Sequence, residues 1–231
     1  MKNNEIKYNA TTEDRRRFLK IGSASATTLL AGSAGMGALI TSNAATAQGS
    51  GYAEINPPQQ TVAPEGKIEV LEYFWFGCPH CYAFEPVINE WAADIPEDVA
   101  FIREAPPLNP AWKPHSEAYY AAEQLGVTEK FFDPMFNGIH AEKKRLRSRK
   151  EIAGFAGDLG IDSREFLGAM KSFAVETRIR QAMQRAIASG INGVPSIVIA
   201  GKYRTGNSLA GGHEGIIRVI NELVESERQK G

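Results

Sequence analysis

The chain has 231 residues, 43% of them apolar and 23% charged, which is an ordinary globular composition and enough material for one or two hydrophobic cores. Its 26 lysine and arginine residues nearly balance its 27 aspartate and glutamate residues, so the overall charge gives no indication of a nucleic-acid surface. Beyond the N-terminus, no internal repeat or low-complexity tract interrupts the sequence.

The first 47 residues have the order of a secretory signal. A basic run at residues 14–20 (DRRRFLK) precedes a weakly apolar stretch at residues 21–40 and a small-residue cleavage site at residues 45–47. The pair Arg15 and Arg16 resembles the twin-arginine export signal, although an aspartate stands where serine or threonine is usual. A membrane anchor is the alternative, but the stretch holds four glycines and five serines or threonines, which disfavours a stable span.

We therefore expect export to the periplasm and cleavage near Ala47, with residues 1–47 as signal peptide and residues 48–66 as an N-terminal extension. Cleavage removes six basic and three acidic residues, which leaves a mildly acidic protein with 20 basic and 24 acidic residues. Such a charge gives no reason for membrane binding. Because the signal contains no cysteine, a lipid anchor through an N-terminal cysteine is excluded.

Both cysteines lie in one short segment, residues 72–86 (EYFWFGCPHCYAFEP), where Pro79 and His80 separate Cys78 from Cys81. After export, such a pair is a structural disulfide, a metal site or a redox centre. Closing so short a loop stabilises a fold by about 2 kcal/mol, against about 3 kcal/mol for a 15-residue loop, so a structural role explains the pair poorly. A zinc knuckle needs a second pair of ligands, and the chain has no other cysteine.

The neighbouring sequence favours the redox centre. Residues 67–76 (KIEVLEYFWF) are rich in β-branched and aromatic residues and predict a buried strand, in which Trp75 or Phe76 can add to an apolar face for unfolded substrates. Gly77 ends this strand, and Pro79 suits the first turn of a helix that follows.

Cys78 is therefore expected at a helix N-terminus. There the exposed backbone N–H groups and the helix dipole lower the pKa of its thiol and make Cys78 the reactive thiolate. His80 favours the thiolate further, and Cys81 points toward the protein one turn later as the partner in the disulfide. Because a stabilised thiolate favours the reduced form, the pair is expected to act as an oxidant.

Residues 114–190 are helical in pattern almost throughout. Segments with helical spacing are separated by glycines and by capping residues, namely Thr128, Ser148 and Asp162. The basic run at residues 143–150 (KKRLRSRK) lacks interleaved aromatic residues, so we interpret it as a solvated helix end rather than a nucleic-acid patch. The histidines outside the cysteine segment have no mutual spacing that suggests a metal site.

A further motif follows at residues 189–206 (SGINGVPSIVIAGKYRTG). PSIVIA predicts a short strand, GK a tight turn and YRT a return strand, so Val194 and Pro195 lead a β-hairpin. A strand, a Cys-x-x-Cys motif that opens a helix containing Pro86, and a Gly-Val-Pro before a hairpin and a last helix together resemble the thioredoxin-like pattern. The CPHC motif and the hairpin sequence are similar to the DsbA branch of that superfamily.

This resemblance covers essentially all of the mature chain and implies an α/β thioredoxin-like fold with an inserted all-helical domain. The first part of the thioredoxin-like domain is then expected at residues 67–107, the helical insertion at residues 108–188 and the second part at residues 189–231. In the family, the proline matching Pro195 follows a cis peptide bond and lies against the disulfide, and the backbone matching Val194 pairs with an extended substrate segment.

The resemblance also assigns roles to two carboxylates. Glu72 in the buried strand and Glu85, one helical turn after Cys81, match acidic residues that tune the cysteines in the family. A buried carboxylate beside Cys81 can exchange the proton that moves during the reaction. A solvated position on the helix surface is the alternative for Glu85. Arg103 stands, in a loose match, where the family often has a lysine.

The implied function is that of an exported thiol:disulfide oxidoreductase, a dithiol oxidase that donates the Cys78–Cys81 disulfide to newly exported proteins without a bound cofactor or metal. Its expected partners are unfolded cysteine-containing proteins and a membrane quinone-linked reoxidase of the DsbB type, and we expect a monomer that binds no nucleic acid.

Two alternatives remain at this point. One is a periplasmic reductase or isomerase with the same cysteines, although isomerases of the superfamily usually carry an N-terminal dimerisation domain and only about twenty residues separate Gln48 from the first predicted strand. The other is a metal-binding protein that captures an ion such as copper through Cys78, His80 and Cys81.

Overall fold

The computed structural model describes residues 49–230, so the predicted signal peptide lies outside the described residues. Within them, five strands form one sheet in the order β1-β5-β4-β2-β3. β2 and β3 are parallel, and the other neighbouring strands are antiparallel. The strands are β1 (Ala53–Glu54), β2 (Ile68–Tyr73), β3 (Val99–Glu104), β4 (Ser196–Ile199) and β5 (Tyr203–Gly206).

The strand predictions around the motifs are confirmed. β2 occupies the predicted buried run, although it ends at Tyr73 and leaves the last aromatic residues in the turn before Cys78. β4 and β5 form the predicted hairpin. The short β1 comes from the segment that we assigned to an N-terminal extension, and it pairs with β5 at the edge of the sheet.

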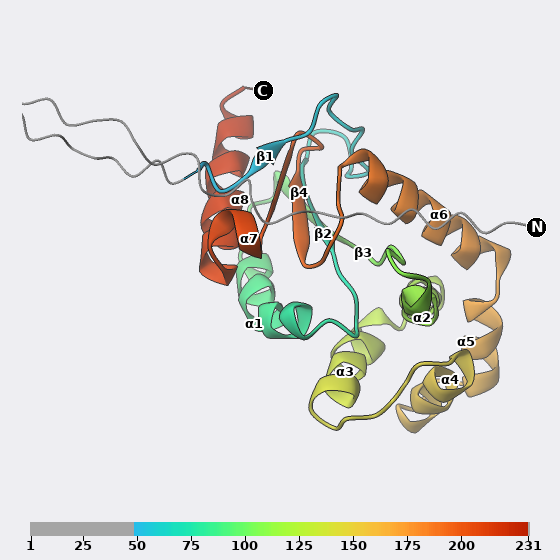
Figure 1. Ribbon diagram of the computed structural model, residues 1–231. Helices are drawn as coiled ribbons and strands as arrows, with labels where there is room; N and C mark the ends of the chain where they lie inside the picture. The colour runs from blue at the N-terminus through green and yellow to red at the C-terminus, as the bar shows by residue number, and fades with distance from the viewer. Residues whose placement is uncertain (1–48, 231) are drawn as a thin grey trace, which may run out of the picture. The chain divides into compact units, whose positions relative to one another are not determined.

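The two faces of the sheet are covered by different helices (Figure 1). Alternate residues of a strand point to opposite faces, so Val70 packs with α1 (Pro79–Ala93) and α8 (His213–Arg228), while Leu71 and Tyr73 pack with the end of α6 (Phe173–Ala188). α7 (Asn207–Ala210) lies between β5 and α8. By this alternation Glu72 belongs to the α1 face, which brings its carboxylate toward the cysteine-bearing helix.

Helices fill the chain between β3 and β4. They are η1 (Pro110–Trp112), α2 (Lys113–Gln124), α3 (Thr128–His140), α4 (Arg149–Asp158), α5 (Ser163–Met170) and α6. Apart from the end of α6, their buried apolar residues form one hydrophobic cluster that also includes both cysteines. In Figure 1, α3 lies next to the start of α1, so the cysteines are located where the helical part meets the sheet. Among the described helices, none is both long and apolar enough to cross a bilayer.

Two local predictions in this helical part need correction. Ser148 and Asp162 cap α4 and α5 through their side chains, but Thr128 is the first residue of α3 and its neighbour Val127 occupies the cap position without a side-chain bond. The basic run is a loop followed by the first turn of α4, not a helix end, and Leu146 in its middle is buried in the core. A single apolar residue among cations was too weak a signal to indicate this anchor.

Candidate active site

Cys78 is the N-cap of α1, as predicted, and Pro79 occupies the first turn. Proline is favoured there because the N–H group it lacks has no partner within the helix. The sulfur of Cys78 accepts a hydrogen bond from the backbone N–H of Cys81 at 3.3 Å, and the Cys78 thiol faces the carbonyl of Val194 at 3.5 Å. Both cysteines are free and buried, and Cys81 is completely inaccessible.

The two thiols differ sharply in acidity. A hydrogen bond from the Cys81 thiol, the backbone N–H groups of Cys81 and His80, and the charge of His80 lower the pKa of Cys78 to about 6, against the opposing effect of burial. Burial raises the pKa of Cys81 far above its ordinary value, and the neighbouring Cys78 sulfur raises it further. At neutral pH the pair therefore holds one thiolate, at Cys78, and one protonated thiol, at Cys81.

The turn before Cys78 is held by one backbone hydrogen bond and one side-chain hydrogen bond. The N–H of Cys78 donates to the carbonyl of Trp75 at 2.9 Å, and Nε2 of His140 donates to the carbonyl of Phe76 at 2.7 Å. At Gly77, a β-carbon would lie 2.3 Å from the Trp75 indole, so only glycine allows the ring to approach this closely. These contacts fix the direction in which the chain enters α1, and with it the position of the Cys78 sulfur.

The loop before β4 forms the opposite wall of the site. The Val194–Pro195 peptide bond is cis, as the resemblance implied, and Pro195 is buried while Val194 is partly exposed. Ser196 donates its hydroxyl to the carbonyl of Gly193 at 2.7 Å and closes the loop. A second cis bond, Asn56–Pro57, lies away from these residues in the sequence and was not predicted.

An ion-pair network lies beside the buried thiol. Arg103 of β3 reaches Glu72 with Nε at 2.9 Å and Glu85 with Nη2 at 3.2 Å, and its guanidinium lies between the rings of Phe101 and Phe132, 4.7 Å from the centre of each. Both carboxylates are buried, which excludes the solvated alternative for Glu85. Arg103, which loosely matches a lysine of the family, is thus the cation that joins the two carboxylates.

Burial dominates the acidity of this network. It raises the pKa of Glu72, although the charge of Arg103 opposes this. Burial and then the charge of Glu72 raise the pKa of Glu85 to about 8. Burial acts against the charged form of Arg103, yet the two carboxylates together raise its pKa. Glu85 therefore carries a proton at neutral pH, one helical turn from Cys81.

One member of the network was missed from the sequence. Asn89 accepts a hydrogen bond from Nη2 of Arg103 at 2.6 Å and donates to Glu85 at 3.2 Å. Its spacing of four residues from Glu85 on a helix was the available signal. Each carboxylate keeps one oxygen, Oε1 of Glu72 and Oε1 of Glu85, without a hydrogen-bond partner among the described residues.

Two pairs of predicted residues remain, namely Pro79 and His80 next to Cys78, and the aromatic residues Trp75 and Phe76. Pro79 and His80 are exposed beside Cys78, where a partner molecule can reach them. Of the two aromatic residues expected at an apolar substrate face, Phe76 is fully buried against Phe131, Phe132 and Phe136 and belongs to the core. In residues 49–230, no three histidine, cysteine or acidic side chains are grouped closely enough to hold a metal ion.

Comparison with known proteins agrees with this geometry. The chain is 43% identical to the thiol:disulfide interchange protein DsbA of Azotobacter vinelandii over 180 residues, which is 78% of this chain and 84% of that protein. It is 36% identical to the protein of the same name from Burkholderia cepacia over 189 residues, 82% of this chain and 89% of the relative.

Solved structures show the same fold. The crystal structure of Pseudomonas aeruginosa DsbA matches with a TM-score of 0.74 at 38% identity and covers 78% of this chain and 93% of that chain. The oxidoreductase DsbA from Xylella fastidiosa matches with a TM-score of 0.71 at 31% identity over 77% and 95% of the two chains. The profile of the DSBA-like thioredoxin domain matches residues 69–212, more than half of the sequence, and the chain therefore belongs to the DSBA-like thioredoxin domain family.

Proposed function

We propose that this protein is an exported thiol:disulfide oxidoreductase that donates the Cys78–Cys81 disulfide to newly exported proteins. The observation that carries the proposal is the unequal pair of thiols. The pKa of Cys78 is lowered to about 6, and that of buried Cys81 is raised. Because a stable Cys78 thiolate favours the reduced pair, the oxidised pair gives its disulfide away readily.

The exchange proceeds in two steps. A substrate thiolate attacks the sulfur of Cys78, the bond to Cys81 breaks, and a mixed disulfide forms between the substrate and Cys78. Cys81 leaves as a thiolate and takes up a proton, because burial raises its pKa. A second substrate thiolate then attacks the substrate sulfur of the mixed disulfide and releases the Cys78 thiolate. Two electrons thereby pass from the substrate thiols to the enzyme cysteines.

The neighbouring residues serve this exchange. Glu85 holds a proton at neutral pH and is our candidate for the group that exchanges it with Cys81. Burial raises its pKa most, Glu72 raises it further, and Arg103 lowers it. Pro79 and His80 shape the environment of the Cys78 thiolate.

Val194 and Pro195 supply the substrate side of the site. The Val194 carbonyl lies 3.5 Å from the sulfur of Cys78, so an extended substrate segment paired with this backbone has its cysteine beside Cys78. The partial exposure of Val194 leaves room for that pairing. No bound cofactor enters this scheme, because the disulfide itself carries the electrons.

We further propose that the protein works in the periplasm as a monomer and that a membrane quinone-linked partner of the DsbB type reoxidises it. Residues 1–47, with the arginine pair at positions 15 and 16, support export by the twin-arginine route. Unprocessed precursor is expected to accumulate in a strain that lacks this export machinery, and normal processing there contradicts the route.

The reduction potential of the Cys78–Cys81 pair tests the function directly. Purified mature protein is equilibrated in glutathione buffers, and its free thiols are counted. A value near about −120 mV, the reference value for the DsbA oxidant of this same family, supports disulfide donation. A value near about −270 mV, as for thioredoxin, means that the pair is kept reduced and that the protein is a reductase.

A further inference from the structure

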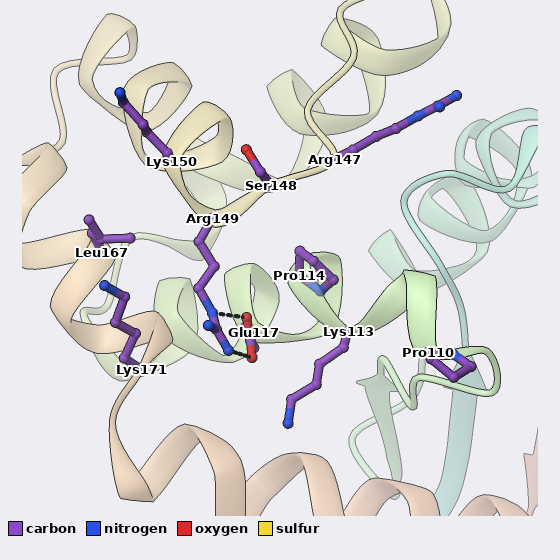
Figure 2. A pocket seen from close by; sticks show the side chains of 10 residues that line it. All are labelled: Pro110, Lys113, Pro114, Glu117, Arg147, Ser148, Arg149, Lys150, Leu167 and Lys171. Carbon is purple, nitrogen blue, oxygen red and sulfur yellow. Dashed lines mark hydrogen bonds and ion pairs between the residues drawn. The ribbon is translucent and has the colours of Figure 1, made fainter.

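Two adjoining hollows lie beside the active-site turn. The first, with a volume of about 620 Å³, reaches from Trp75 and Gly77 to the loop between α3 and α4. The second, of about 750 Å³, continues toward α4 and α5, and Figure 2 shows the side chains around it. Because Pro110, Pro114 and Arg147 line both hollows, the two form one depression, which we call the basic groove.

The basic groove is lined by eight cationic side chains and one carboxylate. The carboxylate is Glu117, and Arg149 already binds it through the two bonds drawn in Figure 2. Lys113 and Lys144 have ion-pair partners outside the groove. Within residues 49–230 the other five have none, namely Lys143, Arg145, Arg147, Lys150 and Lys171. The groove is thus strongly positive on a mature chain that is acidic overall.

The loop that carries four of these cations is anchored to the core. Leu146 is buried, and its carbonyl accepts a hydrogen bond from Nε2 of His115 at 2.7 Å. The N–H of Lys144 donates to the carbonyl of Gly138 at 2.9 Å. Lys143 and Leu146 have positive φ angles of 58° and 32°, which this anchoring sustains. Because the loop is ordered before binding, its cations lose less conformational entropy when a ligand arrives.

The floor of the groove is aromatic, and two unpaired polar atoms lie buried within it. Trp75 and Trp112 stack with their centres 4.4 Å apart, and the ring of His115 stacks on Trp75. His115 is 6% exposed, and burial lowers its pKa, so its ring is neutral. Since Nε2 donates to Leu146, Nδ1 is an acceptor. This Nδ1 and the Nε1–H donor of Trp75 have no partner among the described residues.

The stacked aromatic rings of the floor give a peptide an apolar surface on which to pack. Cations around the same hollow match carboxylates. The hollow also begins one turn from the reactive sulfur, because the N–H of Cys78 donates to the carbonyl of Trp75. A polypeptide rich in aspartate and glutamate combines these features, whereas a flat lipid surface does not reach the floor.

We propose that the basic groove binds an acidic segment of the substrate polypeptide while the substrate cysteine reacts at Cys78. The inference rests on the proposed disulfide exchange and names a preferred substrate class for it. Cysteines flanked by acidic segments are oxidised faster than cysteines in neutral or basic segments.

Matched dithiol peptides test the preference. In the first pair, four glutamates or four glutamines stand on one side of the cysteines. In the second pair, the same four residues stand on the other side of the cysteines. We expect the second-order rate constant for oxidation to be about tenfold higher for the glutamate peptide of at least one pair at low salt, through electrostatic attraction. The advantage disappears at about 1 M salt, where charges are screened beyond about 3 Å. Equal rate constants for both pairs at low salt overturn the proposal.

Two triple variants locate the effect. The groove variant is Lys143→Gln, Arg145→Gln and Arg147→Gln; the control variant, Lys67→Gln, Arg164→Gln and Arg218→Gln, removes the same charge from exposed positions elsewhere. Thermal unfolding checks that both fold. The ratio of the two peptide rates is expected to fall to about one in the groove variant and to stay near tenfold in the control. An equal loss in both variants means that only the overall charge matters and overturns the groove.

Nuclear magnetic resonance gives a second readout. An acidic peptide with serines in place of cysteines is added to the reduced protein, and the indole N–H signals are followed. We expect the Trp75 signal to move, because this residue lines the groove, and the Trp91 signal to stay, because Trp91 lies outside the lining and its Nε1 donates to Asn221 at 2.9 Å. An unmoved Trp75 signal at saturating peptide places the peptide elsewhere and overturns the inference.

Two further controls separate the remaining outcomes. In the first control, the protein is mixed with phosphatidylglycerol vesicles. If it binds them, loses this binding in the groove variant and shows no peptide preference, the cations bind a membrane and the inference is overturned. The glutamine peptide reports the proposed function independently. If it is oxidised while the glutamate peptide has no advantage, only the groove inference fails, whereas a failure to oxidise any peptide contradicts the proposed function.

Discussion

Replacing Cys81 by alanine is expected to raise the pKa of Cys78, because the Cys81 thiol donates the hydrogen bond that lowers this pKa most. In the native protein the pKa of Cys78 is about 6. An ordinary cysteine has a pKa of about 8.5, and each unit corresponds to about 1.4 kcal/mol. The fold therefore favours the Cys78 thiolate by about 3 kcal/mol relative to an unfolded chain.

This stabilisation of the reduced protein depends on pH. Because the folded-state pKa of Cys78 lies below the unfolded-state value, the stabilisation is full above about pH 9 and is lost as the pH falls through about 6. On the order of 1 kcal/mol of it is present at pH 7. For a two-electron couple this energy corresponds to about 20 mV of reduction potential, in the oxidising direction.

Ultraviolet absorbance of the thiolate, followed against pH, measures the effect in single-cysteine variants. In Cys81→Ser the hydroxyl still donates to the Cys78 sulfur, so the midpoint is expected near 6, whereas in Cys81→Ala it moves toward about 8.5. If both variants titrate at the same pH, the Cys81 hydrogen bond does not control the acidity of Cys78, and the reasoning is refuted. Circular dichroism of both variants checks that α1 remains folded.

Three further changes have defined outcomes. Glu85→Gln is expected to remove a loss of stability that the native protein shows as the pH rises from about 4.5 to about 8. In this range the unfolded chain ionises Glu85, while burial keeps it protonated in the folded state, and the loss levels off above about pH 8. Urea midpoints between about pH 5 and about pH 9 measure the decline, and an identical decline in both proteins contradicts the prediction. Gly77→Ala forces the Trp75 indole away from the turn, because a β-carbon would lie 2.3 Å from the ring. We expect a changed tryptophan fluorescence and slower peptide oxidation. If both measurements stay unaltered, the packing of Trp75 on Gly77 is wrong. Ser148→Ala breaks the capping box with Glu151 and is expected to lower the free energy of unfolding, measured by chemical denaturation, by about 1 kcal/mol. Ser163→Ala is the matched control, because Ser163 is the first residue of α5 and not its cap.

Local signals explain which elements were predictable from the sequence. Pro79 after a cysteine, Gly77 before it and a β-branched run upstream act within a few residues, so the strand, the turn and the start of α1 follow from them. The hairpin at β4 and β5 follows in the same way. The missed cap at Val127 and the buried Leu146 have no such local signal, because neighbouring helices decide them.

The candidate site also has a part that local sequence signals predict and a part that they do not. Helical spacing placed Glu85 one turn from Cys81, but it left a solvated position open, since periodicity identifies a face of a helix and not what covers it. β3 covers this face with Arg103, and the covering surface removes water from both carboxylates. The pKa of Glu85 thus depends on tertiary packing: burial and the charge of Glu72 raise it, and the charge of Arg103, 18 positions away in the sequence, opposes the rise.

The sequence by itself determined the chemistry of this protein: one cysteine pair at the start of a helix, where backbone N–H groups favour a thiolate. Only the tertiary structure decided how that chemistry is tuned. It brought the Val194 carbonyl to the sulfur of Cys78 across 116 positions, buried Cys81 completely, and placed the basic groove beside the active-site turn. The physical reason is that desolvation and charge pairing depend on which distant segments pack together, and a local pattern does not contain that information.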